Sequence, residues 1–399
     1  MRVYFDNSAT TRMHKEAADA VYRCMTENFG NPSSLHGIGY DAERAVKQAR
    51  QQIAFLMGTN QKNIIFTGSG TESDNLAIYS AFKSSARMKG RKLIISAVEH
   101  PAVDVCASWM ARGGVNVVRL PVDPYGIIRL GTLKEALDEN TALVSVMHVN
   151  NEIGTIQPIE EIGRLISEEN KAIGREIIFH SDAVQSFAKF PIDIENGDFR
   201  KVDLISFSAH KIHGPKGVGA LYAAKPERLA PVIRGGGQES GIRSGTENVA
   251  GIAGFGVAAR QVGSDMQAHA RRAGECRQRL MDGIMRIVPE ARVNGPVTHS
   301  DIGNAGCCSP YILSVSFPGI KGEVLVHALE ERGIYVSTGA ACSARQRETG
   351  KSNTVLTAIG LTREQADGTV RFSFSRYNTL PEVDYVLENL DIAIERIRR

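Results

Sequence analysis

Short apolar runs rich in β-branched residues recur along the first half of the chain, and most are separated by segments long enough for a helix. The runs are NIIFT (63–67), KLIISAV (92–98), VNVVRL (115–120), TALVSVMHV (141–149), REIIFH (175–180), KVDLISFS (201–208) and GVGALY (217–222). Many lack polar alternation, which is typical of strands covered on both faces. With helices expected over 72–89 and 159–171, the pattern predicts an α/β fold on a mainly parallel, seven-stranded sheet.

The last two runs are joined by Gly-Pro-Lys-Gly alone. This link is too short for a crossover helix, so these two strands should be antiparallel neighbours. After GGGQESGIRSGTEN (235–248) the pattern changes. We expect one long helical stretch from about 249 to 287, then strands at 312–317, 334–337 and 370–375 and helices at 321–332 and 381–398. This order predicts a second, smaller α+β domain.

Length and composition agree with two domains. The chain has 399 residues, which exceeds the usual size of one domain. We predict a large domain over 14–256 and a small domain formed by 1–13 and 257–399.

A net charge of +3 is too balanced to indicate nucleic acid binding. No apolar run is long enough for a membrane span or a signal peptide, so we expect a cytoplasmic protein.

The cysteines do not indicate a metal site or a disulfide framework. The chain has six of them, and none forms a C-x-x-C pair. They are Cys24, Cys106, Cys276, Cys307, Cys308 and Cys342. This scatter argues against structural zinc and fits a reducing compartment. Most should be buried small hydrophobic residues, and Cys307 and Cys308 are interpreted as structural.

Polar residues follow five of the predicted strands, at the point where each strand ends. They fall within 68–72, 99–101, 150–152, 181–185 and 208–211. In open α/β sheets, ligands bind beyond the carboxyl ends of the strands. Five polar strand ends therefore predict a binding site at one edge of the sheet, although a single one would mean little.

Gly68-Ser69-Gly70-Thr71 precedes a predicted helix. Glycines let the backbone approach a ligand closely, and free N–H groups at a helix N-terminus attract a phosphate. The alternative is a plain strand-to-helix turn capped by Thr71. The spacing matches neither a dinucleotide fingerprint nor a P-loop.

Three further residues carry chemistry at this edge. Lys211 directly follows a buried strand, where desolvation makes an amine a nucleophile, whereas Lys216 lies in a turn and is interpreted as structural. Asp182 can hold a proton on a cationic ring nitrogen or simply cap a helix. His100 is a candidate proton carrier or a capping histidine. An amine, a carboxylate and a phosphate cradle are together what pyridoxal phosphate requires.

The motifs in order resemble one family. YFDNSATT, TGSGTESDN, EHPAV, HVNNEIGTIQP, HSDAVQS, SFSAHKIHGPKG, GGGQESGIRSGTEN, STGAACSA and VRFSFSRYNT are similar to those of the cysteine desulfurases. These belong to the class-V aminotransferase branch of the fold-type I pyridoxal-phosphate enzymes. The resemblance covers nearly the whole chain.

The resemblance implies a role for each matching residue around the cofactor. Lys211 would form the Schiff base, Asp182 would bind the pyridine nitrogen and Gln185 the phenolic oxygen. His100 would stack on the ring and help to move protons. The implied phosphate ligands are Gly70, Thr71, Ser208, His210 and, from the other subunit of a homodimer, Thr246. Asn151 and Arg371 would bind the carboxylate of the substrate, L-cysteine.

Cys342 completes the implied set. It lies in a small-residue stretch followed by a polar run, so a mobile loop over about 337–353 is expected to carry its thiol into the site. The resemblance implies that Cys342 takes the sulfur of cysteine as a persulfide, leaving alanine. The persulfide would then pass to an acceptor protein in iron–sulfur cluster assembly or tRNA thiolation.

Two alternatives stay open on the sequence. One is a selenocysteine lyase, which shares the fold of the cysteine desulfurases. Comparing the turnover of cysteine with that of selenocysteine would distinguish the two enzymes. A non-catalytic relative that serves as an interaction subunit should have lost Lys211, Asp182 or Cys342, and all three are present.

Overall fold

The computed structural model describes residues 1–83, 91–297, 308–338 and 354–398. Its larger sheet has seven strands in the order β2-β8-β7-β6-β5-β3-β4. Their bounds are β2 Ile64–Thr67, β3 Lys92–Ser96, β4 Asn116–Leu120, β5 Thr141–Ser145, β6 Ile178–Asp182, β7 Leu204–Ser208 and β8 Gly219–Ala223. Strand β8 is antiparallel to both neighbours and the other pairs are parallel. The mainly parallel sheet and its antiparallel last pair are therefore confirmed.

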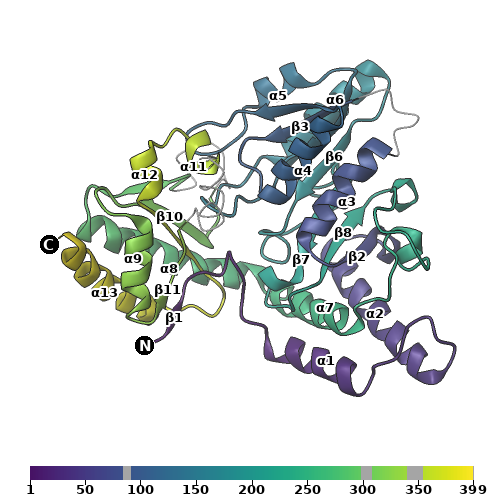
Figure 1. The fold of residues 1–399 in the computed structure, drawn as a ribbon, viewed down its shortest axis with the longest axis horizontal. Coiled ribbons are helices and arrows are strands. Elements are labelled where there is room, and N and C mark those ends of the chain that lie inside the picture. Colours follow the sequence, from purple (N-terminus) through teal and green to yellow (C-terminus); the bar gives the residue numbers. More distant parts are fainter. Residues whose placement is uncertain (84–90, 298–307, 339–353, 399) are drawn as a thin grey trace.

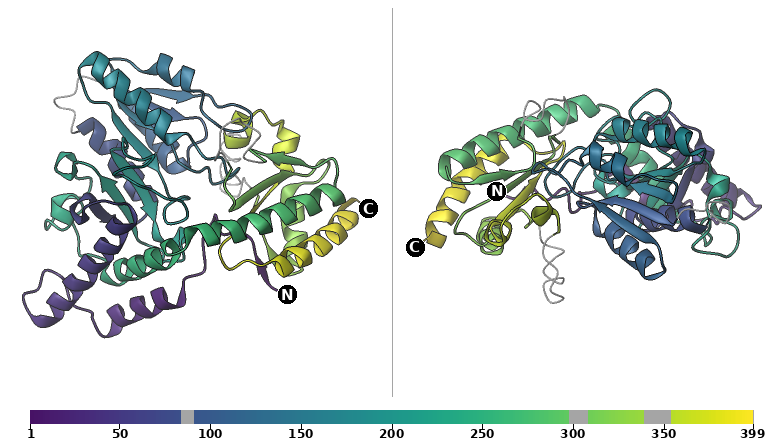
Figure 2. Two further views of the ribbon diagram at one scale, coloured as in Figure 1. Left: turned by 180° about the vertical axis from the view of Figure 1, so that it is seen from behind. Right: turned by 90° about the horizontal axis from the view of Figure 1, so that it is seen from above.

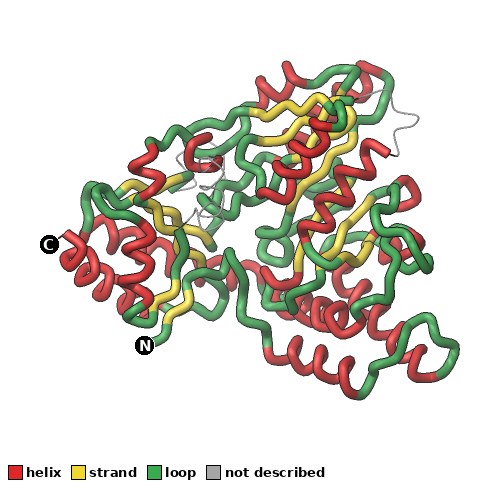
Figure 3. Tube along the Cα trace, in the orientation of Figure 1, coloured by secondary structure: helices red, strands yellow, loops and turns green. Residues whose placement is uncertain are grey.

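Helices cover both faces of this sheet (Figures 1 and 3). The helices of this part are α1 Lys15–Thr26, α2 Gly37–Leu56, α3 Gly70–Lys83, α4 Pro101–Arg112, α5 Leu130–Ala136, α6 Ile159–Ile173 and α7 Val249–Gly263. Buried side chains of α3 and α4 pack on one face. Those of α2, α5, α6 and α7 pack on the other.

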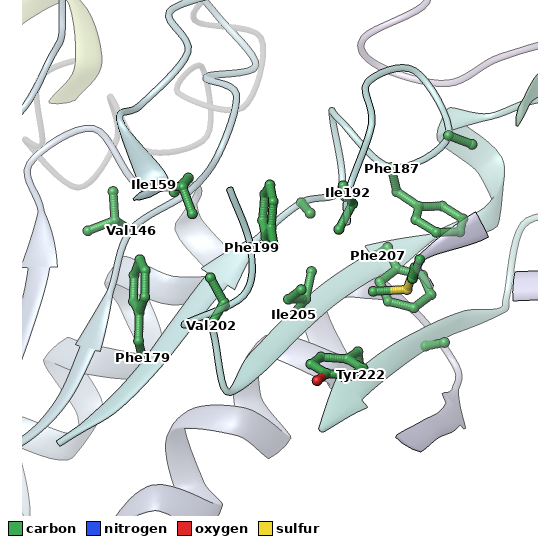
Figure 4. Close-up of a cluster of buried hydrophobic side chains, with 14 of the residues drawn as sticks. Val146, Ile159, Phe179, Phe187, Ile192, Phe199, Val202, Ile205, Phe207 and Tyr222 are labelled. Atoms are coloured by element: carbon green, nitrogen blue, oxygen red, sulfur yellow. The ribbon is translucent and has the colours of Figure 1, made fainter. Parts of the chain in front are cut away.

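The core beneath the second face is aromatic at its centre. Phe187 stacks on Phe207 with ring centroids 4.4 Å apart, and Phe255 of α7 meets both rings edge-on. Figure 4 shows Phe187 and Phe207 with Phe179, Ile205 and other side chains of the same cluster, above strands β6, β7 and β8. Side chains on both faces of β7 are buried, so the strand that leads to Lys211 is held on two sides.

The C-terminal part forms smaller sheets of its own, packed by helices (Figure 2). Strands β12, β10 and β9 form an antiparallel sheet, and β1 pairs in parallel with β11. Their bounds are β1 Val3–Tyr4, β9 Arg292–Asn294, β10 Ile312–Ser316, β11 Ile334–Tyr335 and β12 Thr369–Ser373. The helices are α8 Met266–Ile287, α9 Gly322–Glu330, α11 Thr354–Ala358, α12 Arg363–Asp367 and α13 Leu380–Arg398.

The expected single helical stretch from 249 to 287 is wrong. The chain forms two helices, α7 and α8, with a break at Ser264 and Asp265. Asp265 has a non-helical φ of -149°, and its side chain accepts the Ala268 N–H at the start of α8. An aspartate that caps the second helix ends the continuity that the apolar periodicity predicted.

The α+β character of the C-terminal part agrees with the sequence prediction. The domain bounds of 14–256, with 1–13 and 257–399, stay a prediction. Within the described ranges, no helix combines the length and the apolar character that crossing a membrane requires.

Candidate active site

A cavity of about 420 Å³ lies at the carboxyl edge of the large sheet. Its wall includes residues that follow β2, β3, β5, β6 and β7, together with Arg371 of β12 and part of the N-terminal segment. The polar strand ends of the sequence therefore meet in one place. The predicted residues that line this cavity are Gly70, Thr71, His100, Asn151, Asp182, Gln185, Ser208, His210, Lys211 and Arg371.

Lys211 ends a short 3-10 turn, Ala209–Lys211, directly after β7. Its amine donates to the carbonyl oxygens of Ser8 at 2.5 Å and Ala9 at 2.8 Å. The turn is fixed by the Ala209 N–H, which donates to the Val218 carbonyl on the way into β8. Lys216, in contrast, is exposed and does not line the cavity.

The N-terminus of α3 faces the same cavity. Ser69 rather than Thr71 caps the helix, because its Oγ accepts the Glu72 N–H at 3.1 Å. Packing here is tight, since a Cβ on Gly70 would lie 2.7 Å from the Val184 side chain. Because Ser69 is the cap, the hydroxyl of Thr71 is not used for capping, and the positive end of the helix suits a phosphate.

Three buried carboxyl groups lie at or beneath the cavity: Asp74, Glu99 and Asp182. Burial raises the pKa of Glu99 to about 8 and that of Asp182 to about 6. Burial and the nearby Asp182 hold the pKa of Asp74 well above its usual range. Asp182 accepts the Val184 N–H at 2.8 Å, and the positive charge of Lys211 opposes the rise of its pKa. The site is thus built to take a cationic partner at Asp182.

His100 is the N-cap of α4, followed by Pro101 at the first helical position. Its Nδ1 accepts the Ala102 N–H at 3.1 Å. Burial, followed by the charge of Lys211, lowers the pKa of His100 to about 4. The ring is therefore neutral near pH 7 and carries its proton on Nε2, so it presents a hydrogen-bond donor to the cavity.

Gln185 is tied to the same N-terminal segment as Lys211. Its Nε2 donates to the Ser8 carbonyl at 3.0 Å, and its Oε1 accepts from the buried amine of Lys189 at 3.5 Å. Burial, followed by the charge of Lys211, lowers the pKa of Lys189 to about 7. Since only the oxygen of the amide can accept from an amine, these contacts fix the amide with its N–H groups toward the cavity side.

Arg371 reaches the cavity from β12 and is buried. Its Nη1 donates to the carbonyl oxygen of Asn151, and its Nη2 pairs with the carboxylate of Asp6, both at 2.9 Å. The guanidinium is therefore held in place by the chain itself, on a buried side chain.

One predicted and described residue is not found in this cavity. Thr246 is not among the residues that line it within one chain. Cys342 and Cys307 lie outside the described residues. The expected loop over 337–353 is described only for its first two residues, and Ser337 and Thr338 line the cavity.

Several lining residues were missed from the sequence. Asp6, Ser8 and Ala9 precede the first helix, and Asp74 lies inside a predicted helix. No strand end marks these positions. The only signals were the YFDNSATT motif, which holds Asp6, Ser8 and Ala9, and the TGSGTESDN motif, which holds Asp74; the resemblance included both motifs but gave these residues no role.

Comparison with known proteins identifies the family. The model of the family "Aminotransferase class-V" matches residues 3–386. A curated "Cysteine desulfurase IscS" from Methanosarcina thermophila is 41% identical over 396 residues, which cover 99% of this chain and 93% of that protein. The chain belongs to the cysteine desulfurases of the class-V aminotransferase family.

Solved structures agree with this assignment. A "NifS-like protein" superposes with a TM-score of 0.89 at 38% identity, covering 99% of this chain and 100% of that one. The structure of "SspA in complex with cysteine" gives a TM-score of 0.77 at 34% identity, covering 94% of this chain and 100% of that one. The fold is therefore that of the fold-type I pyridoxal-phosphate enzymes.

Cysteine desulfurases depend on pyridoxal phosphate, and the cavity fits that cofactor on chemical grounds. Lys211 supplies an amine, Asp182 a buried carboxylate, and the start of α3 supplies the positive end of a helix. Asp74 in the same wall is buried as well, with its Oδ1 3.6 Å from the Nε2 of His180. A polar, cationic ring with a phosphate is the class of molecule that these groups can satisfy.

Proposed function

We propose that this enzyme removes the sulfur of L-cysteine, releases L-alanine and holds the sulfur as a persulfide on Cys342. The gathering of Lys211, Asp182 and the α3 N-terminus in one cavity, on a chain whose relatives are named cysteine desulfurases, carries the proposal. The related structure of SspA "in complex with cysteine" supports the substrate.

Each residue of the cavity has its own role toward the cofactor or the substrate. Lys211 holds the cofactor through its amine and, once free, takes the proton from the α-carbon of the substrate. Asp182 keeps the ring nitrogen protonated, and Gln185 donates to the phenolic oxygen. Bound pyridoxal phosphate supplies the electron sink for this chemistry. His100 would stack on the bound ring and, with its Nδ1 occupied by the Ala102 N–H, would donate from Nε2.

The phosphate and the substrate carboxylate have separate partners. Gly70, Thr71, Ser208 and His210 hold the phosphate, joined by Thr246 of the partner subunit in a homodimer. Arg371 and Asn151 bind the carboxylate, because a guanidinium offers parallel donors to its two oxygens.

The sulfur leaves the site on Cys342. The thiolate of Cys342 attacks the substrate sulfur, and the electron pair of the breaking carbon–sulfur bond stays with the carbon skeleton. One proton added to the β-carbon and one returned to the α-carbon give alanine. An acceptor protein in iron–sulfur cluster assembly or tRNA thiolation then takes the sulfur. Many relatives carry the name IscS, which supports an acceptor of this kind. We place the enzyme in the cytoplasm.

The test separates cofactor binding from sulfur transfer. Cys342→Ala should abolish alanine release from cysteine while the visible absorption band of the bound cofactor persists. Cys106→Ala is the matched control, because that thiol is buried in α4 and burial raises its pKa to about 11. Unchanged alanine release in Cys342→Ala would exclude the persulfide role of this residue.

A further inference from the structure

Asp6 and Arg371 form an ion pair in the wall of the active-site cavity. The Arg371 Nη2 lies 2.9 Å from the Asp6 Oδ1, and the side chains are 7% and 20% exposed. The Arg371 Nη1 is held by the Asn151 carbonyl oxygen. Among the described residues, the buried Nε of Arg371 has no acceptor. One N–H of this buried guanidinium is therefore unsatisfied, while Nη1 and Nη2 are both held by the chain.

The backbone around Asp6 is fastened to the strand that carries Arg371. The Ser373 N–H donates to the Phe5 carbonyl at 2.7 Å, and the Asn7 N–H donates to the Ser373 carbonyl at 3.3 Å. The Ser8 N–H donates to the Ser373 hydroxyl at 2.8 Å. The carboxylate of Asp6 is thus held beside Arg371 by the chain on both sides of it.

The same segment reaches Lys211. Two and three residues beyond Asp6, the carbonyl oxygens of Ser8 and Ala9 accept from the Lys211 amine. Residues 6–9 therefore extend from the guanidinium that binds the substrate carboxylate to the amine that the substrate amino group must replace. An α-amino acid bound between these two points would lie along this segment, whose one carboxylate side chain is that of Asp6.

We infer that Asp6 determines the charge specificity of the substrate pocket, favouring a zwitterionic amino acid over a carboxylate that lacks an amino group. The inference rests on the proposed role of Arg371 in binding the substrate carboxylate. Asp6 cancels the charge of Arg371. A zwitterion places its carboxylate against Arg371 and its ammonium near Asp6, whereas a simple anion meets Asp6 with no positive charge to offset the repulsion.

The experiment compares two ligands that differ only by the amino group, L-alanine and propionate. Their dissociation constants for the holoenzyme are measured by calorimetry and by competition with cysteine turnover. Asp6→Asn removes the charge and keeps the shape. The preference for alanine over propionate should fall by roughly tenfold or more, which is the size of one charge-assisted contact.

Control variants separate the possible causes. Asp6→Glu keeps the charge and should preserve the preference to within about threefold. Asp384→Asn removes the acid of an exposed pair with Arg279 and should leave both dissociation constants unchanged. If Asp6→Asn and Asp6→Ser change both affinities by the same factor, Asp6 supports Arg371 only and the inference is wrong.

A failure of the proposed function would appear in the dissociation constants of an Arg371 variant rather than in those of the Asp6 variants. Arg371→Gln should weaken alanine and propionate together, because both depend on the guanidinium. If propionate binds Arg371→Gln as tightly as it binds the unaltered enzyme, then Arg371 does not bind the carboxylate. That outcome contradicts the proposed role of Arg371, whichever result the Asp6 variants give.

Discussion

At the scale of single residues, buried carboxyl groups determine the electrostatics of the cavity. Asp182 ends β6, and the sequence identified this position because a carboxylate lies at the end of a predicted strand. Asp74 was not visible, since it lies in a polar stretch of a helix. Its burial results from the packing of α3 across β6, β7 and β8, which a single sequence does not specify. The residues that chain order alone could identify are those at strand ends.

Asp182→Asn tests this electrostatic role. The neutral amide no longer stabilises a protonated ring nitrogen, so alanine release should fall about a hundredfold or more, while Lys211 and the phosphate contacts still hold the cofactor. Alanine formation and the visible cofactor band are both measured.

Asp203→Asn is the matched control for Asp182→Asn. Asp203 accepts the Phe179 N–H at 2.9 Å, and burial raises its pKa to about 6 as well, but it does not line the cavity. Equal losses of activity in the two variants would contradict a specific role for Asp182.

At the scale of elements, the phosphate cradle depends on a strand that never meets the ligand. Gly219 begins β8, and a Cβ there would lie 2.6 Å from the carbonyl carbon of Ser69. The approach of β8 to the start of α3 thus requires glycine. The sequence predicted the cradle and the antiparallel β7–β8 pair separately, and only the structure shows that the pair supports the cradle.

The break between α7 and α8 was not predicted, because apolar periodicity does not show where a capping residue interrupts a helix.

Gly219→Ala should weaken cofactor binding by about tenfold or more, because Ser69 must move and the first turn of α3 moves with it. Cofactor affinity is measured by titrating the cofactor-free protein with pyridoxal phosphate. Gly131→Ala in α5 adds the same methyl group where nothing lies within 4 Å, and it should leave the affinity unchanged. An unaltered affinity in Gly219→Ala would exclude this support of the cradle.

At the scale of the whole molecule, the active site joins the two ends of the chain. The segment around Asp6 and Ser8 pairs with β12, more than 360 residues later, and meets β6 and β7 through Gln185 and Lys211. Contacts between residues so far apart in the sequence cannot be predicted from local sequence patterns. The fold class and most of the cavity could therefore be predicted, but the N-terminal wall could not.

The buried His148 makes the free energy of unfolding depend on pH. His148 lies edge-on to Phe199 with ring centroids 4.9 Å apart, and burial lowers its pKa to about 4. The unfolded chain binds this proton near pH 6.5, so the stabilising contribution is complete above that pH and is lost as the pH falls toward 4.

His148→Gln should therefore reduce the slope of unfolding free energy against pH by about 1.4 kcal/mol per pH unit between about pH 6.5 and 4. Urea unfolding over a pH series measures it. His327→Gln is the control, because that ring is exposed on α9 and contacts water in both states. An unchanged slope in His148→Gln would show that this ring is not kept neutral by the fold.

The most direct measurement locates the cofactor on the chain. The holoenzyme is reduced with borohydride, digested, and its peptides are mapped by mass spectrometry. The geometry predicts the pyridoxyl adduct on Lys211, whose amine lies in the cavity with Asp182 and the start of α3. An adduct on the buried Lys189 or the exposed Lys216, with Lys211 unmodified, would contradict the assignment of this cavity as the active site.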